Sequence, residues 1–360
     1  MQLEGATHVD DMGNAWAAAG WSARRDAVMR GAKAIRERFD AEKPVVAVRT
    51  LPLATAVYPT KFAYWGTAFS PAPYVTLALN ALLVQFRQRG RVKNLLFEPT
   101  DVEGAKRTPF YASVIAQYGP RISNMLSKTF GPVEDRLAQL EVPAEEIDYV
   151  VFDHFHVQDL RKLFARFPNA TLVAQSVEWR HWEDASPIQR AWLVPDGRDG
   201  VDAARVALVD GEVQLGDGVM LARTPGHTPG NQTLFFKTED GVWGASENGS
   251  AADNWSPDAS RIPGVAKSAR REGVDFVLNA NTRDDGGRQY LSMALEKAIV
   301  DPAKGADGFV QMLPSSQVLP SLLSPFLSPT HRHADLRYGD VEVRKERATR
   351  KEKLGADVVA

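Results

Sequence analysis

Residues 153–159 read Asp153-His154-Phe155-His156-Val157-Gln158-Asp159. The preceding run, Tyr149–Phe152, is apolar and of strand length, and Leu160–Phe167 behind it has its apolar residues at helical spacing. Two histidines separated by one residue at the exit of a buried strand can direct both imidazoles at one ion. The whole chain has only seven histidines. This placement therefore predicts a metal-binding loop rather than two surface histidines.

A further histidine lies in a turn rich in proline and glycine. Residues 221–236 predict a strand, a turn and a second strand, and the turn Thr224–Gly230 reads Thr-Pro-Gly-His-Thr-Pro-Gly. His227 stands at the tip of this turn, where backbone geometry would hold it in place. A histidine in such a turn is structural more often than it is a ligand. Its position after a strand and a His-x-His loop nevertheless indicates a third metal ligand.

With these segments the chain resembles the metallo-β-lactamase superfamily, in particular its lactonase and glyoxalase II-like branch. The resemblance extends over Val45–Leu313 and includes Val92–Pro99, which is similar to the family strand that ends in Asp-Thr-Gly. It implies an α/β fold, the αββα sandwich of that superfamily. We expect this domain over residues 44–313, a helical extension over 1–43, and a C-terminal strap with a charged tail over 314–360.

The departures from the family pattern fall on one half of the implied metal centre. The family loop reads His-x-His-x-Asp-His, and this chain has Gln158 and Asp159 at the last two positions. The family's bridging aspartate corresponds to Glu247, and its final histidine to Asn281. The second histidine of the family's His-Thr-Pro-Gly-His turn is Asn231.

The resemblance therefore implies one complete ligand set and one depleted set. His154, His156 and His227 with Glu247 make a four-ligand site, or a three-ligand site with an open position. We expect one divalent ion per chain, zinc or iron, with manganese also compatible, because imidazole ligands do not select a single metal. A second ion remains an alternative if Asp159, Glu247 and Asn281 cooperate.

Composition limits the partners of this protein. The chain of 360 residues is longer than the ~200–250 that one such sandwich needs, which leaves room for extensions. A net charge of −2 argues against nucleic acid. Without cysteines there is neither a disulfide framework nor a thiolate site. The N-terminus lacks a basic-then-apolar signal and no run is long enough to span a membrane, so we expect a cytoplasmic protein.

Several segments outside the metal motif carry expectations of their own. An apolar face predicts a helix in the N-terminal extension that packs on its own domain or makes a homodimer contact (Trp21, Val28, Ala32, Ile35 and Phe39). Further helices are predicted at residues 112–117, 133–140 and 160–167. Aromatic residues within Tyr58–Gly66 can line an apolar pocket or a strand core. His181 is expected to be a packing or surface residue, and His331 and His333 an exposed basic turn whose role stays open.

The chemistry that follows is hydrolytic. A metal held by His154, His156 and His227 can activate water or polarise a carbonyl group. Gln158 cannot accept a proton, so Asp159 and Glu247 are the candidate catalytic carboxylates. We expect a metal-dependent hydrolase acting on a small, partly apolar lactone, ester or thioester. One alternative is a mononuclear iron oxygenase or dioxygenase on the same fold, and another is a metal-free ligand-binding or regulatory protein.

Overall fold

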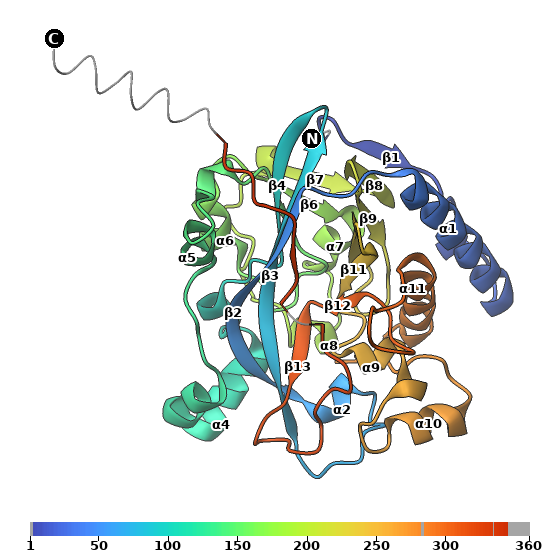
Figure 1. The fold of residues 1–360 in the computed structure, drawn as a ribbon. Coiled ribbons are helices and arrows are strands. Elements are labelled where there is room, and N and C mark those ends of the chain that lie inside the picture. Colours follow the sequence, from blue (N-terminus) through green and yellow to red (C-terminus); the bar gives the residue numbers. More distant parts are fainter. Residues whose placement is uncertain (1–2, 282–283, 334, 345–360) are drawn as a thin grey trace.

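Two β-sheets form the centre of the molecule (Figure 1). The structure is a computed structural model and describes residues 3–281, 284–333 and 335–344. The first sheet has the strand order β1-β8-β9-β10-β11-β12. Its strands are β1 (Thr7–Val9), β8 (Glu212–Gly216), β9 (Val219–Arg223), β10 (Gln232–Thr238), β11 (Gly241–Ser246) and β12 (Met312–Pro314).

The second sheet has the order β14-β2-β3-β4-β5-β6-β7, with β13 paired to β3 beside this path. Its strands are β14 (Arg337–Tyr338), β2 (Ala47–Pro59), β3 (Tyr74–Gln88), β4 (Arg91–Phe97), β5 (Tyr149–Val151), β6 (Thr171–Gln175), β7 (Val206–Val209) and β13 (Ser316–Leu319). The strands from β4 to β7 are parallel, so the loops after them leave from the same edge.

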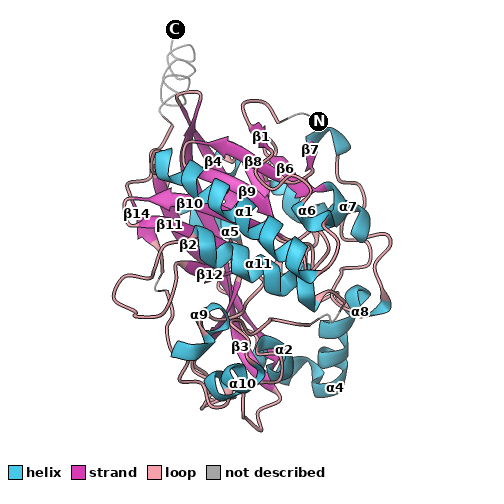
Figure 2. Ribbon diagram, turned by 90° about the vertical axis from the view of Figure 1, so that its right-hand side faces the viewer, coloured by secondary structure: helices cyan, strands magenta, loops and turns pink. Residues whose placement is uncertain are grey.

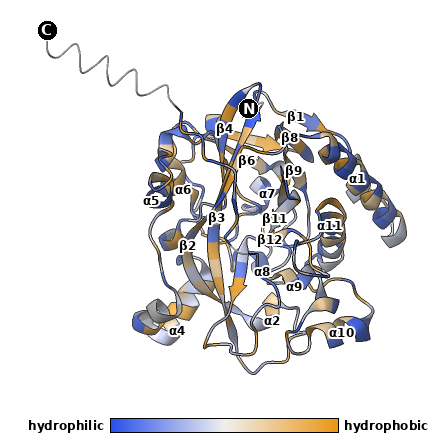
Figure 3. Cartoon of the chain, viewed as in Figure 1, coloured by the Kyte–Doolittle hydropathy of each residue, from blue (hydrophilic) through white to orange (hydrophobic). Residues whose placement is uncertain are grey.

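Side-chain alternation along the strands makes four layers. In β10, Leu234 and Phe236 join the apolar core between the sheets, whereas Phe235 points to the other face. There it packs with the long helices α1 (Trp21–Ala41) and α11 (Gly286–Ile299). The outer face of the second sheet packs with α5 (Val133–Ala138) and α6 (Leu160–Leu163). Figure 2 shows these helices outside the sheets, and Figure 3 shows hydrophobic residues concentrated on the central strands.

The remaining helices connect the strands. They are α2 (Thr60–Ala63), α3 (Val102–Ala105), α4 (Pro109–Leu126), α7 (Ser176–His181), α8 (Pro187–Arg190), α9 (Ala252–Trp255) and α10 (Val265–Glu272). Short 3₁₀ turns occur at Ala15–Ala17, Ala144–Glu146, Phe164–Arg166, Ala203–Arg205 and Pro257–Ala259. The helices predicted at residues 112–117, 133–140 and 160–167 are confirmed as α4, α5 and α6, the last continued by a 3₁₀ turn. No helix of the described residues is both long and apolar enough to cross a membrane.

Both terminal segments add strands to the sandwich. The N-terminal segment contributes β1, which pairs with β8, and α1, which packs on α11 through Val28, Ala32, Ile35 and Phe39. Trp21, predicted on the same buried face, is 48% exposed at the start of that helix. The C-terminal strap contributes β13 and β14. The charged tail predicted at residues 345–353 lies outside the described residues.

Candidate metal centre

Two loops at one edge of the sandwich carry the three predicted histidine ligands. His154 and His156 follow β5, in a loop that turns into α6 through Val157, whose φ of 59° is unusual for a β-branched residue. His227 lies in the turn between β9 and β10. Gly226 precedes it with a φ of 145°, and a Cβ atom there would lie 2.2 Å from the Gln289 backbone. The turn can approach α11 this closely only with glycine at that position.

The three imidazole rings meet at one point. The ring centroids of His154 lie 4.6 Å from those of both His156 and His227, and the last two are 5.1 Å apart. One nitrogen from each ring falls within 4.8 Å of the others. Among the described residues, this is the one group of three or more histidine or acidic side chains close enough to share an ion. The predicted convergence of His154, His156 and His227 is therefore present.

Each ring is oriented by a hydrogen bond on its far side. His154 Nδ1 lies 2.5 Å from Asp153 Oδ1, and His156 Nε2 lies 2.6 Å from Gln189 Oε1. His227 Nδ1 donates to the Asn279 carbonyl oxygen at 3.1 Å. Such outer partners fix ring orientation and tautomer in protein metal sites. On the inner side of the cluster, His156 Nδ1 lies 3.3 Å from His227 Nε2 and 3.3 Å from the Asn281 amide nitrogen.

Electrostatics favour neutral rings at two of the three positions. Burial, with the charge of His154 adding to it, lowers the pKa of His227 to about 3. Burial and the same neighbour lower the pKa of His156 well below its ordinary value. At His154 burial also disfavours the charged ring, but the Asp153 carboxylate outweighs it and raises the pKa. Neutral imidazole is the form that binds a metal.

Comparison with known proteins gives a partial sequence match. No family model matches the chain. N-acyl homoserine lactonases of a Bacillus species and of Bacillus thuringiensis are each 26% identical to it over 110 residues, which is 29% of this chain. The match spans 41% of each relative's own length, or about two-fifths of those curated proteins.

Solved structures give a weak likeness over more of the chain. A quorum-quenching N-acyl homoserine lactone lactonase superposes with a TM-score of 0.45 and 17% identity, covering 64% of this chain and 87% of that one. AidC, described as a dizinc quorum-quenching lactonase, gives 0.47 and 13%, covering 84% and 98%. These scores show at most a similar fold. The αββα layers and the two histidine loops resemble those of the metallo-β-lactamase superfamily.

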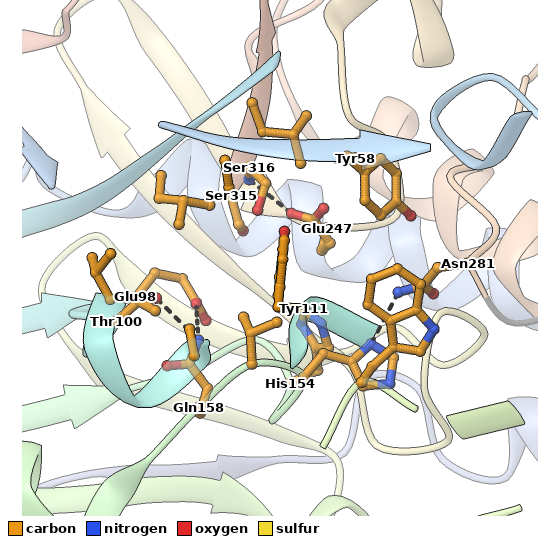
Figure 4. Close-up of a pocket in the computed structure, with 18 of the residues that line it drawn as sticks. Tyr58, Glu98, Thr100, Tyr111, His154, Gln158, Glu247, Asn281, Ser315 and Ser316 are labelled. Atoms are coloured by element: carbon orange, nitrogen blue, oxygen red, sulfur yellow. Dashed lines mark hydrogen bonds between the residues drawn. The ribbon is translucent and has the colours of Figure 1, made fainter. Parts of the chain in front are cut away.

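Gln158 and Asp159, which depart from the family loop pattern, direct their side chains to different parts of the structure. Gln158 lines the pocket beside the histidines. Its Nε2 donates to Glu98 Oε2 at 3.0 Å and to Thr100 Oγ1 at 3.1 Å, while its Oε1 has no hydrogen-bond partner (Figure 4). An acceptor of this kind, buried at the site, can take a hydrogen bond from water or substrate.

Asp159 is not brought to the histidines. Its carboxylate caps α6 by accepting from the Arg161 backbone, and it pairs with the side chains of Arg161 at 2.7 Å and Arg107 at 3.2 Å. Gly104 packs closely against its Cβ. The sequence suggested Asp159 as a ligand and a catalytic base. The structure instead engages this carboxylate with two guanidinium groups and the N-terminus of α6. Burial nevertheless outweighs the charge of Arg107 and raises the pKa of Asp159.

Glu247 enters the pocket from the end of β11, as its bridging position implied. It is 5% exposed. Its Oε1 accepts from Asn279 Nδ2 at 2.9 Å and its Oε2 from the Ser316 backbone at 2.7 Å. Burial raises the pKa of Glu247 to about 8, the Asp153 charge raises it further, and His154 opposes both. Glu247 lines the same pocket as the three histidines but is not in the group close enough to share an ion, so its role as a fourth ligand stays a prediction.

Two polar partners at the site, Glu98 and Gln189, were not identified as site residues from the sequence, whereas Asn281 was. Glu98, with a φ of 55°, directs its carboxylate at the Asp153 backbone and at Gln158. Asn281, which replaces the last family histidine, lies with its amide nitrogen 3.3 Å from His156 Nδ1. The position of Glu98 at the end of β4 was a visible signal, because the family strand ends there in an acidic residue. Gln189 in α8 had no such signal.

The pocket itself is narrow and has an aromatic wall. Tyr58, from the predicted aromatic segment, lines it together with Tyr111 of α4 and Trp192 after α8 (Figure 4). The Tyr58 hydroxyl donates to Asn279 Oδ1 at 2.7 Å. The cavity volume of about 70 Å³ compares with the ~10–15 Å³ needed by one ordered water, so it admits a small chemical group beside the histidines.

The other histidines singled out from the sequence lie elsewhere. His181 is half-buried at the end of α7. His333 packs on Trp243 and its Nε2 lies 3.0 Å from the Val310 carbonyl oxygen. His331 stacks edge-on against His333 and contacts Phe309. The pair is therefore more buried than the exposed turn that was predicted, because both rings pack on aromatic side chains.

Proposed function

We propose that this protein is a metal-dependent hydrolase that opens the ester bond of a small, partly apolar molecule, with a lactone as the leading candidate. The observation that carries the proposal is the convergence of three imidazole nitrogens whose opposite nitrogens are each held by another group. The donor set of His154, His156 and His227 suits zinc, iron or manganese. The lactonase names of the partial relatives support the same substrate class.

One ion per chain is part of the proposal. The positions that would complete a second site hold Gln158, Asp159 and Asn281, and the Asp159 carboxylate is engaged with arginines. When bound, a divalent ion supplies Lewis acidity that polarises a carbonyl group. Everything else in the reaction falls to side chains of this chain.

Glu247 is the proposed proton acceptor, in the ionised form that predominates above its raised pKa of about 8. Its carboxylate lies in the pocket and interacts with His154, whereas the amide of Gln158 cannot take a proton. Water forms the new bond to the acyl carbon, its proton passes to Glu247, the ring C–O bond breaks, and that proton then goes to the leaving alkoxide. The partnerless Oε1 of Gln158 and Oδ1 of Asn281 are placed to accept hydrogen bonds from the water.

The aromatic wall accounts for the apolar part of the substrate. The ring centroid of Trp192 lies 4.3 Å from that of Phe110, on which it stacks, and 5.7 Å from that of Tyr58. An apolar surface beside a polar centre favours a substrate with an alkyl or aryl substituent next to the reacting carbonyl.

Hydrolysis of a lactone panel and of activated esters and thioesters by metal-loaded protein tests the proposal. Glu247→Gln should keep the ion and lower kcat by about 10²–10⁴, the usual contribution of a general base. The exposed Glu272 offers a matched control, since Glu272→Gln should leave kcat unchanged. Metal-loaded protein that is inert toward all these substrates, or iron-loaded protein that consumes dioxygen instead, contradicts the hydrolase.

A further inference from the structure

A further cavity lies beside the N-terminal segment. It is lined by residues of the segment after β1, the β7–β8 turn, β9 and the start of α11. Figure 1 shows where these elements lie in the fold. The volume of the cavity is about 390 Å³, within the range of small-molecule sites. It shares no lining residue with the pocket at the histidines. We call it the N-terminal cavity, defined by Asp10, Trp16, Asp210, Glu212, Arg223 and Arg288.

Three hydrogen-bond donors of this cavity have no acceptor within the described parts of the chain. They are the indole Nε1 of Trp16 and the Nε atoms of Arg223 and Arg288. Trp16 is only 9% exposed. Arg223 donates through Nη2 to the Pro229 carbonyl oxygen, and Arg288 pairs with Asp285. Buried donors without partners are rare in folded proteins, and a missing ligand is one of the few explanations.

A buried acceptor belongs to the same lining. Glu212 is 3% exposed, and its Oε1 has no hydrogen-bond partner among the described residues. Burial raises the pKa of Glu212 to about 7, although a hydrogen bond that its carboxylate accepts from the Arg223 backbone N–H acts to lower it. Arg223 and Arg288 both line this cavity. Burial lowers the pKa of Arg223, and the positive charge of Arg288 lowers it further. Their mutual repulsion favours an anion between them.

Opposite charges line the cavity without pairing. Among the described residues, no ion pair joins Arg223 to Glu212, Asp10 or Asp210. The negative charges of Asp210 and Glu212 nevertheless act to raise the pKa of Arg223. If these acidic and basic side chains paired with one another, they would fill the cavity. Because they stay apart, the cavity can take a ligand that carries one positive and one negative charge.

We propose that the N-terminal cavity binds an α-amino acid, with its carboxylate on Arg223 and Arg288 and its amino group on Glu212. Guanidinium groups bind carboxylates through two parallel hydrogen bonds. The Trp16 N–H adds a third donor, and the volume leaves room for a side chain. This site is independent of the hydrolase proposed above, and neither depends on the other.

Isothermal titration calorimetry of the full chain with each proteinogenic α-amino acid tests the site. At least one should bind at one equivalent per chain. Acetate and methylammonium, which carry one charge each, should bind at least about tenfold more weakly, because each makes half of the charged contacts. A failure of this experiment leaves the metal content and the hydrolysis assay unaffected.

Matched variants locate the binding. Arg288→Gln and Glu212→Gln should each weaken the amino acid by about tenfold or more, and Arg30→Gln, on an exposed position of α1, should not. Because Arg288 is only half-buried, we expect Arg288→Gln to fold, so binding can still be measured with that variant if Glu212→Gln does not fold. Absence of binding by every amino acid, affinity for acetate or inorganic phosphate alone, or equal binding by all three variants overturns the proposal.

Discussion

Gln189 controls the orientation of His156, and its substitution gives a sharp test of the metal centre. The Gln189 side chain is 1% exposed and its Oε1 lies 2.6 Å from His156 Nε2. This acceptor holds a proton on Nε2 and leaves Nδ1, which faces His227 Nε2 and the Asn281 amide, as the unprotonated nitrogen. In Gln189→Ala the proton can move to Nδ1, and the ring loses its anchor. A lost hydrogen bond of about 1–2 kcal/mol corresponds to roughly tenfold in affinity, and outer partners of metal ligands commonly contribute 10–100-fold.

The assay is zinc affinity measured by competition with a chromophoric chelator. Gln189→Ala should bind zinc about 10–100-fold more weakly. Gln189→Glu keeps an acceptor at the same place and should bind within a few-fold of the parent protein. Gln311→Ala is the control, because Gln311 is equally buried but bonds to Asp240 and Pro302. The reasoning fails if Gln189→Ala binds zinc normally, or if Gln189→Glu is as weak as Gln189→Ala.

Two further predictions concern buried carboxylates outside the imidazole cluster. Asp159→Asn removes the charge paired with Arg107 and Arg161. Chemical denaturation should show a free energy of unfolding lower by about 1–2 kcal/mol, a value kept small because both arginines are partly exposed. Zinc affinity should be unchanged, and a large loss of it would instead make Asp159 a ligand. Glu212 has a folded pKa raised from 4.5 to about 7, mainly by burial and further by Asp11, against the opposing effect of Arg223. Its contribution is therefore fully present below pH ~4.5 and is lost as the pH rises through about 7, up to ~3 kcal/mol. Urea denaturation of Glu212→Gln between pH 4.5 and 8 should show a correspondingly flatter profile, and parallel profiles for variant and parent would contradict it.

Local sequence was enough to find the three histidines that converge in the structure. His154 and His156 follow an apolar strand directly, and His227 lies in a turn whose prolines and glycines dictate its geometry. Both signals are contained in a few consecutive residues. The same applies to α1, whose buried residues recur at helical spacing and pack on α11 of the same chain.

The role of Asp159 could not be predicted in this way. Its family position suggested a ligand, and the change from histidine to aspartate kept a group able to bind metal. Arg107, which comes from the loop after α3, is distant in sequence and becomes its neighbour only in the folded chain. A carboxylate pairs with nearby positively charged groups, which here are the guanidinium groups of Arg107 and Arg161.

The outer partners of the histidines were also beyond local reasoning. Gln189 and Asn279 lie in segments with no periodic or motif signal, and both are brought to the rings by long-range packing. Glu98 depends on a left-handed backbone at the end of β4. The strands β1 and β13 are only three and four residues long, and each forms by pairing with a distant partner. Short strands of this kind have too little pattern to be recognised.

The number of metal ions per chain tests the central claim most directly. Protein loaded with excess zinc, desalted and analysed by inductively coupled plasma mass spectrometry should contain one ion per chain. His154→Ala, His156→Ala and His227→Ala should each contain almost none, because no other described side chain can replace the lost imidazole. Two ions in the parent protein, or a full ion in any of the three variants, would contradict a single site built on these histidines.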